Sequence, residues 1–263
     1  MIPRPASPQT PRRGALERLF ALGRPSWVVA LRPAPREIAP GLWSVDRALG
    51  GTLGPQFPTR SLLVELPGGG LLVWSPVPLD DALLEFVRAR GGARFLVAPN
   101  SFHHLGLAEW KRAFPEAALW LALGLRARCP ALPAGEELAN EAPTPFAASF
   151  AHRALDSGRG LSEVAFLHAP SRTLVLVDAC FNLQQLPRAI DRIAARLLGV
   201  WRRFGATPTA RRFLLRNRAA VTAWVEQLCE WEFSRIVMAH GDVLTAGPAE
   251  LRAVFVEVGG VDA

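Results

Sequence analysis

The sequence predicts an α/β (α+β) fold in which two sheets pack together and helices cover their outer sides. Half of the 263 residues are hydrophobic, which is enough for a sizeable core in one compact domain. Strand-like runs followed by helix-like runs occur twice along the chain, a pattern that two packed sheets satisfy. Runs joined by tight turns at 60–76 and 162–178 favour antiparallel hairpins. The alternative, one doubly wound parallel sheet, fits these hairpins less well.

In the first half, apolar runs bounded by glycine and proline predict strands at 41–48, 60–67, 71–76, 94–99 and 117–123. The turn PGGG at 67–70 joins the second of these strands to the third. A helix is predicted at 79–90, with Asp80 or Asp81 in its first turn. Residues 105–114 form a second predicted helix. The histidine pair of the sequence VAPNSFHHLGLAEW therefore lies between a buried strand and a helix.

In the second half, further apolar runs predict strands at 145–155, 162–170, 172–178 and 234–239. A helix at 186–199 is predicted from the helical spacing of Leu186, Ile190, Ile193 and Leu197, with Pro187 at its first position. A long helix opens at Thr207–Pro208, and its inward-facing residues are predicted to be Leu214, Val221, Val225 and Leu228. A last helix is predicted at 248–256.

The charge of the chain is +7, and Lys111 is its single lysine. The arginine excess permits an anionic substrate or partner, although scattered arginines also solvate helix faces. Arginines recur along 186–199 and crowd the start of the next helix, but Asp191, Glu226 and Glu230 dilute this charge. These positions favour solvated helix faces over a nucleic-acid-binding surface. We expect a small-molecule substrate and no nucleic-acid partner. The basic charge of the chain would allow this substrate to be anionic.

The cysteines and the N-terminal residues bear on the compartment. Cys129, Cys180 and Cys229 are odd in number, far apart and without a CxxC motif, which predicts a reducing, cytoplasmic compartment. Cys180 lies two residues from Asp178 and is a candidate reactive thiol as well as a small buried hydrophobe. Residues 1–37 are basic and proline-rich and are predicted to be a partly mobile extension, not a secretory signal. No apolar run is long enough to span a bilayer.

Four potential metal ligands follow the ends of three predicted strands: His103, His104, Asp178 and His240. A carboxylate at the end of the apolar run TLVLVD is costly unless it is paired or bound to a cation. Residues beyond the carboxyl ends of strands gather on one rim of an α/β fold, where sites form. Imidazole and carboxylate suit Zn²⁺, Fe or Mn. A strand-end aspartate can also be a helix cap, and a single histidine can be structural, as we expect for His152 and His168.

The blocks FPTRSLLVELPGGGLLVWSPVPLDD, APNSFHHLGLAEW and PSRTLVLVD, together with MAHGD, resemble the metallo-β-lactamase superfamily, and within it a branch described as a domain of unknown function. The resemblance covers roughly residues 38–260. It implies a domain at 38–263 with a four-layer αββα sandwich of two mixed sheets. It also implies a metal site on the rim between these sheets.

The superfamily signature HxHxDH is degenerate in this sequence, which reads PNSFHH at the matching place. The first two histidine positions of the signature hold Pro99 and Ser101. The aspartate position holds His103, and the last histidine is His104. The mid-chain histidine of the superfamily is replaced by Arg159. The resemblance therefore implies that this sequence lacks the three histidine ligands of one of the two metals that the superfamily binds.

The positions that hold the second metal in the superfamily keep residues able to bind a metal, with His103 in place of aspartate. This pattern predicts a mononuclear site with the ligands His103, His104, Asp178 and His240. The alternative is that His103 does not bind the metal itself and only supports a residue that does. Arg159 is a candidate for binding a substrate oxyanion beside Asp178; the other interpretation is an ordinary surface arginine in the loop SGRG.

The resemblance implies a metal-dependent hydrolase with one divalent ion, zinc before iron or manganese. Asp178 would orient the attacking water or accept its proton. Ester, thioester or lactone bonds are favoured, because phosphodiester cleavage is served best by two metals. Loss of catalysis, leaving a binding or scaffold protein on the same fold, is the alternative. The sequence does not define the substrate or the oligomeric state.

Overall fold

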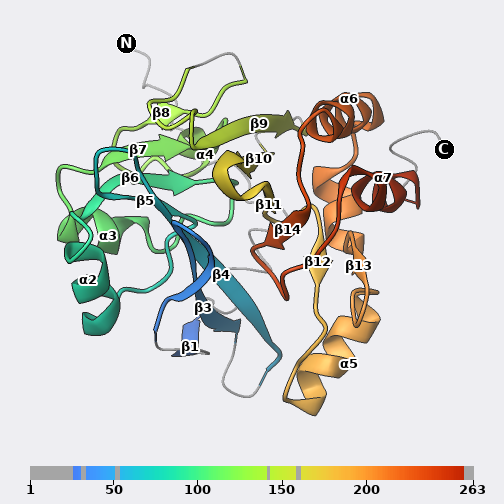
Figure 1. Ribbon diagram of the computed structural model, residues 1–263. Helices are drawn as coiled ribbons and strands as arrows, with labels where there is room; N and C mark the ends of the chain where they lie inside the picture. Colours follow the sequence, from blue (N-terminus) through green and yellow to red (C-terminus); the bar gives the residue numbers. More distant parts are fainter. Residues whose placement is uncertain (1–25, 31–33, 51–53, 141–142, 158–160, 258–263) are drawn as a thin grey trace, which may run out of the picture.

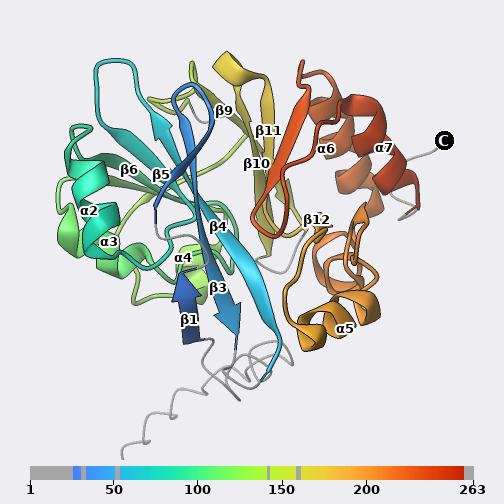
Figure 2. The same ribbon diagram turned by 60° about the horizontal axis from the view of Figure 1, so that its bottom comes forward.

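The chain folds as a four-layer α/β sandwich, in which two sheets face each other and helices cover their outer faces (Figure 1, Figure 2). The structure, a computed structural model, describes residues 26–30, 34–50, 54–140, 143–157 and 161–257. Both predicted hairpins are antiparallel and lie in different sheets, so the alternative of one doubly wound parallel sheet is wrong. Within these described ranges, no helix has the length and apolar character needed to cross a membrane.

Within the described residues, the first sheet has eight strands, all between Ser26 and Glu137. In spatial order they are β1 (Ser26–Ala30), β3 (Leu42–Gly50), β4 (Gln56–Glu65), β5 (Leu71–Trp74), β6 (Ala93–Ala98), β7 (Ala118–Leu121) and β8 (Glu136–Glu137), and β2 (Arg36–Ala39) pairs with β3. Neighbours from β1 to β5 are antiparallel, whereas β5 to β8 are parallel. The loop with the two histidines leaves β6 at the carboxyl end of these parallel strands. β1 lies within the predicted N-terminal extension, and residues 1–25 lie outside the described ranges.

The second sheet has four strands in the order β14-β11-β10-β9. They are β9 (Phe150–Asp156), β10 (Ser162–His168), β11 (Thr173–Leu176) and β14 (Arg235–Met238). β11 and β14 are parallel, so the residues that follow them, Asp178 and His240, leave the sheet at the same rim. A small pair, β12 (Phe181–Asn182) and β13 (Phe204–Gly205), extends this rim.

Helices pack on the outer face of each sheet. The first sheet carries α2 (Asp81–Arg88), α3 (Leu107–Ala113) and α4 (Leu125–Arg128), and the second carries α6 (Arg218–Cys229) and α7 (Pro248–Glu257), while α5 (Ala189–Leu197) lies beside the rim (Figure 2). Asp80 begins α2 as predicted, because its Oδ1 accepts the Leu83 N–H at 2.8 Å. Short 3₁₀ and π-helical turns occupy Ala169–Ser171 and Ala210–Leu214.

Three apolar clusters hold the four layers together. The central one lies between the sheets and joins Trp74 and Val97 to Phe150, Phe166 and Val237. A second cluster packs α2 and α3 on the first sheet, and the third packs α6 and α7 on the second sheet. The five named side chains of the central cluster are fully buried, and the burial of each contributes about 1.5–3 kcal/mol to stability. The strands β6, β11 and β14, which end at the rim between the sheets, are thus anchored in the central cluster.

Helix α5 differs from the prediction in its buried face. Ile193 and Leu197 have exposed fractions of 55% and 81%, and the buried residues are Asp191 and Ala195. Asp191 Oδ1 accepts the backbone N–H of Gln56 at 2.8 Å, which fixes the helix with its carboxylate inward. The long helix predicted from Thr207 is also divided into the π-helical turn Ala210–Leu214 and helix α6. Asn217 begins α6, because its side-chain oxygen accepts the Ala220 N–H. Apolar spacing alone does not distinguish the buried face of so short a helix.

Stability is expected to fall below pH 6.5 because of His168, the last residue of β10. Burial lowers the pKa of His168 to about 4, and its Nδ1 lies 2.6 Å from Ser171 Oγ. His168 takes up a proton near pH 6.5 in the unfolded chain but only near pH 4 in the folded chain. Protonation therefore favours the unfolded state, so the stability linked to His168 is fully present above pH 6.5 and is lost as the pH falls toward 4. Between pH 7 and pH 5 the free energy of unfolding should drop by about 2 kcal/mol from this residue.

Urea unfolding of the wild type and His168→Gln at both pH values tests this expectation. The variant should lose less stability on acidification than the wild type. An identical loss in both proteins would mean that His168 is not held neutral by the fold.

Candidate metal centre

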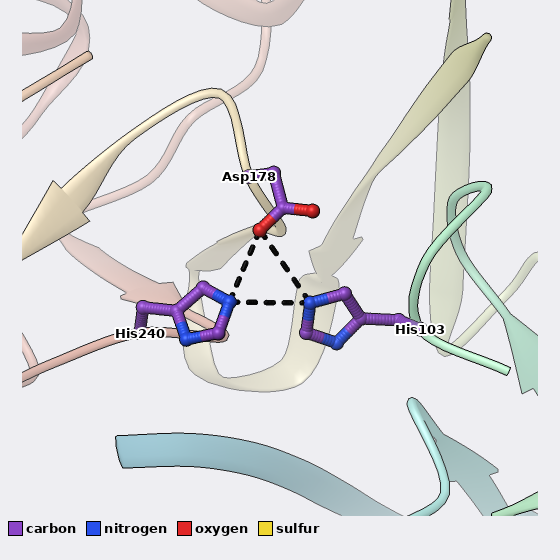
Figure 3. A group of neighbouring side chains, drawn as sticks. All are labelled: His103, Asp178 and His240. Atoms are coloured by element: carbon purple, nitrogen blue, oxygen red, sulfur yellow. Dashed lines mark hydrogen bonds and ion pairs between the residues drawn. The ribbon is translucent and has the colours of Figure 1, made fainter. Parts of the chain in front are cut away.

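Three of the predicted ligands, His103, Asp178 and His240, meet at the rim between the two sheets (Figure 3). His103 Nε2 lies 3.2 Å from His240 Nε2 and 3.5 Å from Asp178 Oδ1. His240 Nε2 lies 3.1 Å from the same carboxylate oxygen. The three atoms come from loops after β6, β11 and β14, so residues far apart in sequence form one compact triangle.

The tautomer of His240 is determined by its second nitrogen. Nδ1 lies 2.8 Å from the carbonyl oxygen of Pro58, which can only accept, so Nδ1 carries the hydrogen. Nε2 is then the nitrogen that faces Asp178 and His103, and in a neutral ring it can offer a lone pair to a metal ion. Gly241 follows with φ +113°, and a Cβ atom there would lie 2.1 Å from the Asn182 carbonyl oxygen. The backbone after His240 therefore requires glycine.

Asn100 links the loop of His103 to Asp178. Its Oδ1 accepts the N–H groups of Phe102 at 2.9 Å and His103 at 2.8 Å, and its Nδ2 donates to Asp178 Oδ2 at 2.6 Å. The side chain is 1% exposed, so these bonds are shielded from water. The Asn100 amide thus orients His103 and Asp178, and the other oxygen of Asp178, Oδ1, faces the Nε2 atoms of His103 and His240.

Glu163 supports Asp178 from the backbone side. This fully buried residue of β10 accepts the N–H groups of Val177 at 3.0 Å, Asp178 at 2.9 Å and Ala179 at 2.8 Å. Burial, together with the nearby charge of Asp178, raises the pKa of Glu163 to about 8. Burial would also raise the pKa of Asp178, but His103 and His240 outweigh it and hold that pKa well below its usual range. Asp178 is therefore the charged member of the two acids at neutral pH.

Ser75 holds His103 from a strained backbone. Its Oγ lies 2.8 Å from His103 Nδ1, and its φ of +52° is in the left-handed region that favours glycine. Such a conformation costs about 1–2 kcal/mol for a residue with a side chain. The residue is buried directly after β5, at the carboxyl end of the strand beside β6. The Ser75 hydroxyl thus reaches His103 at a cost in backbone strain.

Comparison of Ser75→Gly with Ser75→Ala should separate these two effects. Both variants lose the hydroxyl, and we expect both to bind zinc about 10-fold more weakly than the wild type. The free energy of unfolding should be about 1 kcal/mol higher for Ser75→Gly than for Ser75→Ala, because glycine relieves the backbone strain. Equal stability of the two variants would contradict the strained backbone, and wild-type zinc affinity would contradict the supporting role of the hydroxyl.

The structure does not bring His104 into the triangle. His104 is not among the residues whose ligand atoms gather there, and its Nε2 lies 3.6 Å from Cys129 Sγ at the end of α4. Burial and the neighbouring His103 lower the pKa of His104. Arg159 lies at 158–160, outside the described residues. Cys180 is fully buried, and burial raises the pKa of its thiol, which disfavours a reactive role.

The residues present fit a single divalent cation. Ligand bonds of 2.0–2.2 Å in a tetrahedral arrangement separate neighbouring donor atoms by about 3.3–3.6 Å, close to the 3.1–3.5 Å found between these three atoms. Two imidazoles and a carboxylate are a donor set used for zinc and for non-haem iron. Without a proton or cation between them, the His240 lone pair and the Asp178 oxygen would repel each other.

Comparisons with known proteins agree with this architecture. The model of the family described as "Domain of unknown function (DUF4336)" matches residues 41–211. The crystal structure of the DIM-1 metallo-β-lactamase is similar with a TM-score of 0.62 at 11% identity, over 88% of this chain and 99% of that one. The metallo-β-lactamase FIM-1 from Pseudomonas aeruginosa, in its mono-zinc form, has a TM-score of 0.58 at 13% identity, over 90% and 98%.

A flavodiiron protein shares the fold as well. The Flv1 flavodiiron core from Synechocystis sp. PCC6803 has a TM-score of 0.52 at 12% identity, over 86% of this chain and 60% of that one. No curated protein sequence matches the chain. At these identities the similarity concerns the fold, whereas the family model covers most of the sequence. The chain thus belongs to the DUF4336 family, a branch of proteins with the metallo-β-lactamase fold.

Proposed function

We propose that His103, Asp178 and His240 hold one divalent metal ion and that the chain is a mononuclear metal-dependent hydrolase. The observation that supports this most is the triangle of donor atoms, 3.1–3.5 Å apart, with each ligand held by a further hydrogen bond. Three protein ligands leave a coordination position for water or substrate, as in catalytic zinc sites. FIM-1 was crystallised with a single zinc in this fold, which makes one metal a reasonable stoichiometry.

The chemistry we propose is hydrolysis of an ester, thioester or lactone. A divalent ion held there would supply a water of pKa about 7 and would polarise the substrate carbonyl. Asp178 Oδ2 is anchored by Asn100, so the carboxylate stays in one orientation, in which it can orient that water or accept its proton. The Pro58 carbonyl engages Nδ1 of His240, which leaves Nε2 as the nitrogen that would bind the metal ion. Arg159 remains our candidate for binding the substrate oxyanion.

Zinc is our first choice of metal, and iron or manganese are the alternatives, since the same donors suit all three. The test uses the metal-free chain, titrated with each ion and assayed on 4-nitrophenyl acetate, a thioester and a lactone. We expect activity on at least one substrate that rises to one equivalent of metal and then stops rising. Stoichiometric metal binding without hydrolysis of any substrate would favour the non-catalytic alternative, and no binding would refute the site itself.

A further inference from the structure

A cavity of about 600 Å³ adjoins the residues around His240, one of the three candidate ligands. Pro58, whose carbonyl accepts the His240 hydrogen bond, and Gly241, which follows His240, both line it. Its other walls come from β2, from the loop after β12, from α5 and from Trp201–Arg202. This volume lies within the range of about 300–1,000 Å³ typical of small-molecule sites. The cavity shares a wall with the candidate metal centre and has room for a substrate.

The charged lining of the cavity is predominantly basic: Arg36, Arg60, Arg192, Arg202, Asp46 and Asp242. Arg60 is buried and pairs with Asp46, with Nε 2.7 Å from Oδ1, so these two charges cancel. Asp242 Oδ2 accepts the Gln184 N–H at 3.1 Å. Four arginines against two aspartates leave a net charge of +2 around the cavity.

Arg192 is held by hydrogen bonds that do not neutralise it, and the exposed Arg202 lies against a tryptophan ring. Arg192 donates from one nitrogen to the carbonyl oxygens of Leu186 at 2.9 Å and Pro187 at 2.6 Å, and both acceptors are uncharged. The Arg202 guanidinium lies 5.3 Å from the centre of the Trp201 ring. Within the described part of the chain, no carboxylate lies within 4.0 Å of either guanidinium. Guanidinium groups that no carboxylate neutralises bind carboxylate and phosphate oxygens well.

We propose that this cavity is a subsite for an oxyanion on the substrate, a carboxylate or a phosphate, bound by Arg192 and Arg202. The bond to be cleaved would then point to the wall shared with His240, next to the three candidate ligands. This inference rests on the proposed hydrolase function for its catalytic meaning, but the anion subsite itself does not require the metal. The preferred substrates are accordingly anionic esters, thioesters or lactones.

A binding experiment tests the subsite in the metal-free protein. Glutarate and inorganic phosphate are titrated calorimetrically as probes of the two oxyanions, and we expect at least one to bind with Kd below about 10 mM. Arg192→Gln and Arg202→Gln should each weaken that binding at least about 10-fold. Arg112→Gln, with the same charge change on an exposed position of α3, should bind as the wild type does. Failure of both anions to bind, or unchanged affinity in the cavity variants, would overturn the subsite.

An activity arm distinguishes this proposal from the function on which it rests. In the metal-loaded protein, kcat/KM is compared for mono-4-nitrophenyl glutarate and for neutral 4-nitrophenyl acetate. Arg192→Gln should reduce the preference for the anionic ester at least about 10-fold and leave metal stoichiometry unchanged. Hydrolysis of both esters with no anion preference would refute only the subsite. Anion binding lost in the two variants, without hydrolysis of either ester, would refute only the hydrolase.

Discussion

Replacement of His240 by glutamine is expected to weaken zinc binding at least about 100-fold, because it removes one of three protein ligands and its fixed lone pair. His103→Gln should have a loss of the same order, since its Nε2 occupies the second corner of the triangle. Titration of each metal-free protein with zinc in the presence of a competing chelator measures these affinities. Thermal unfolding without metal verifies that each variant is folded.

His104→Gln is the matched control, because it makes the same substitution one residue away. The ring of His104 contacts Cys129 and not the triangle, so its variant should bind zinc within about 3-fold of the wild type. The adjacent histidines should therefore give opposite results. Loss of zinc in His104→Gln together with retention in His103→Gln would contradict the assignment of ligands in this loop.

Glu163→Ala should be the most destabilising single change at this rim. It leaves the N–H groups of Val177, Asp178 and Ala179 without their acceptor in a fully buried place. Each lost partner costs about 1–2 kcal/mol, so we expect the free energy of unfolding to fall by roughly 3–6 kcal/mol. That is a large share of the total stability of a typical domain. Urea unfolding at pH 7, or loss of soluble protein on expression, would report it.

Two further variants make this prediction specific. Glu163→Gln keeps one oxygen that can accept two of the three bonds, and its expected loss is about 1–2 kcal/mol. Glu136→Ala removes an exposed acid on β8 and should change stability by less than about 0.5 kcal/mol. If alanine and glutamine at position 163 are equally stable, the carboxyl does not anchor the Asp178 turn.

The sheets could be predicted from the sequence because strands on both sides of a sandwich core are continuous apolar runs with clear turns. The same reasoning placed His103, Asp178 and His240 beyond the ends of β6, β11 and β14. The parallel pairing of β11 with β14 then brings two of them together. The strands β1, β2 and β8 were not predicted: β1 lies in residues assigned to the N-terminal extension, and β2 and β8 are short with few apolar residues.

The supporting residues were also not found from the sequence. Glu163 could have been noticed, because a charged residue within the apolar run SEVAF is costly without hydrogen bonds. Asn100 and Ser75 have no such signal: their roles depend on a side-chain bridge between loops and on a backbone angle. His104 was predicted as a ligand from its place in a motif, whereas the turn made by Asn100 directs only His103 toward the centre.

The most direct measurement is a crystal structure of the zinc-loaded chain with anomalous data on both sides of the zinc edge. We predict one anomalous peak, within bonding distance of His103 Nε2, His240 Nε2 and Asp178 Oδ1, and no peak beside His104. A structure in which zinc-saturated protein shows no peak among these three atoms, or shows the ion held by other residues, would contradict the metal centre described above.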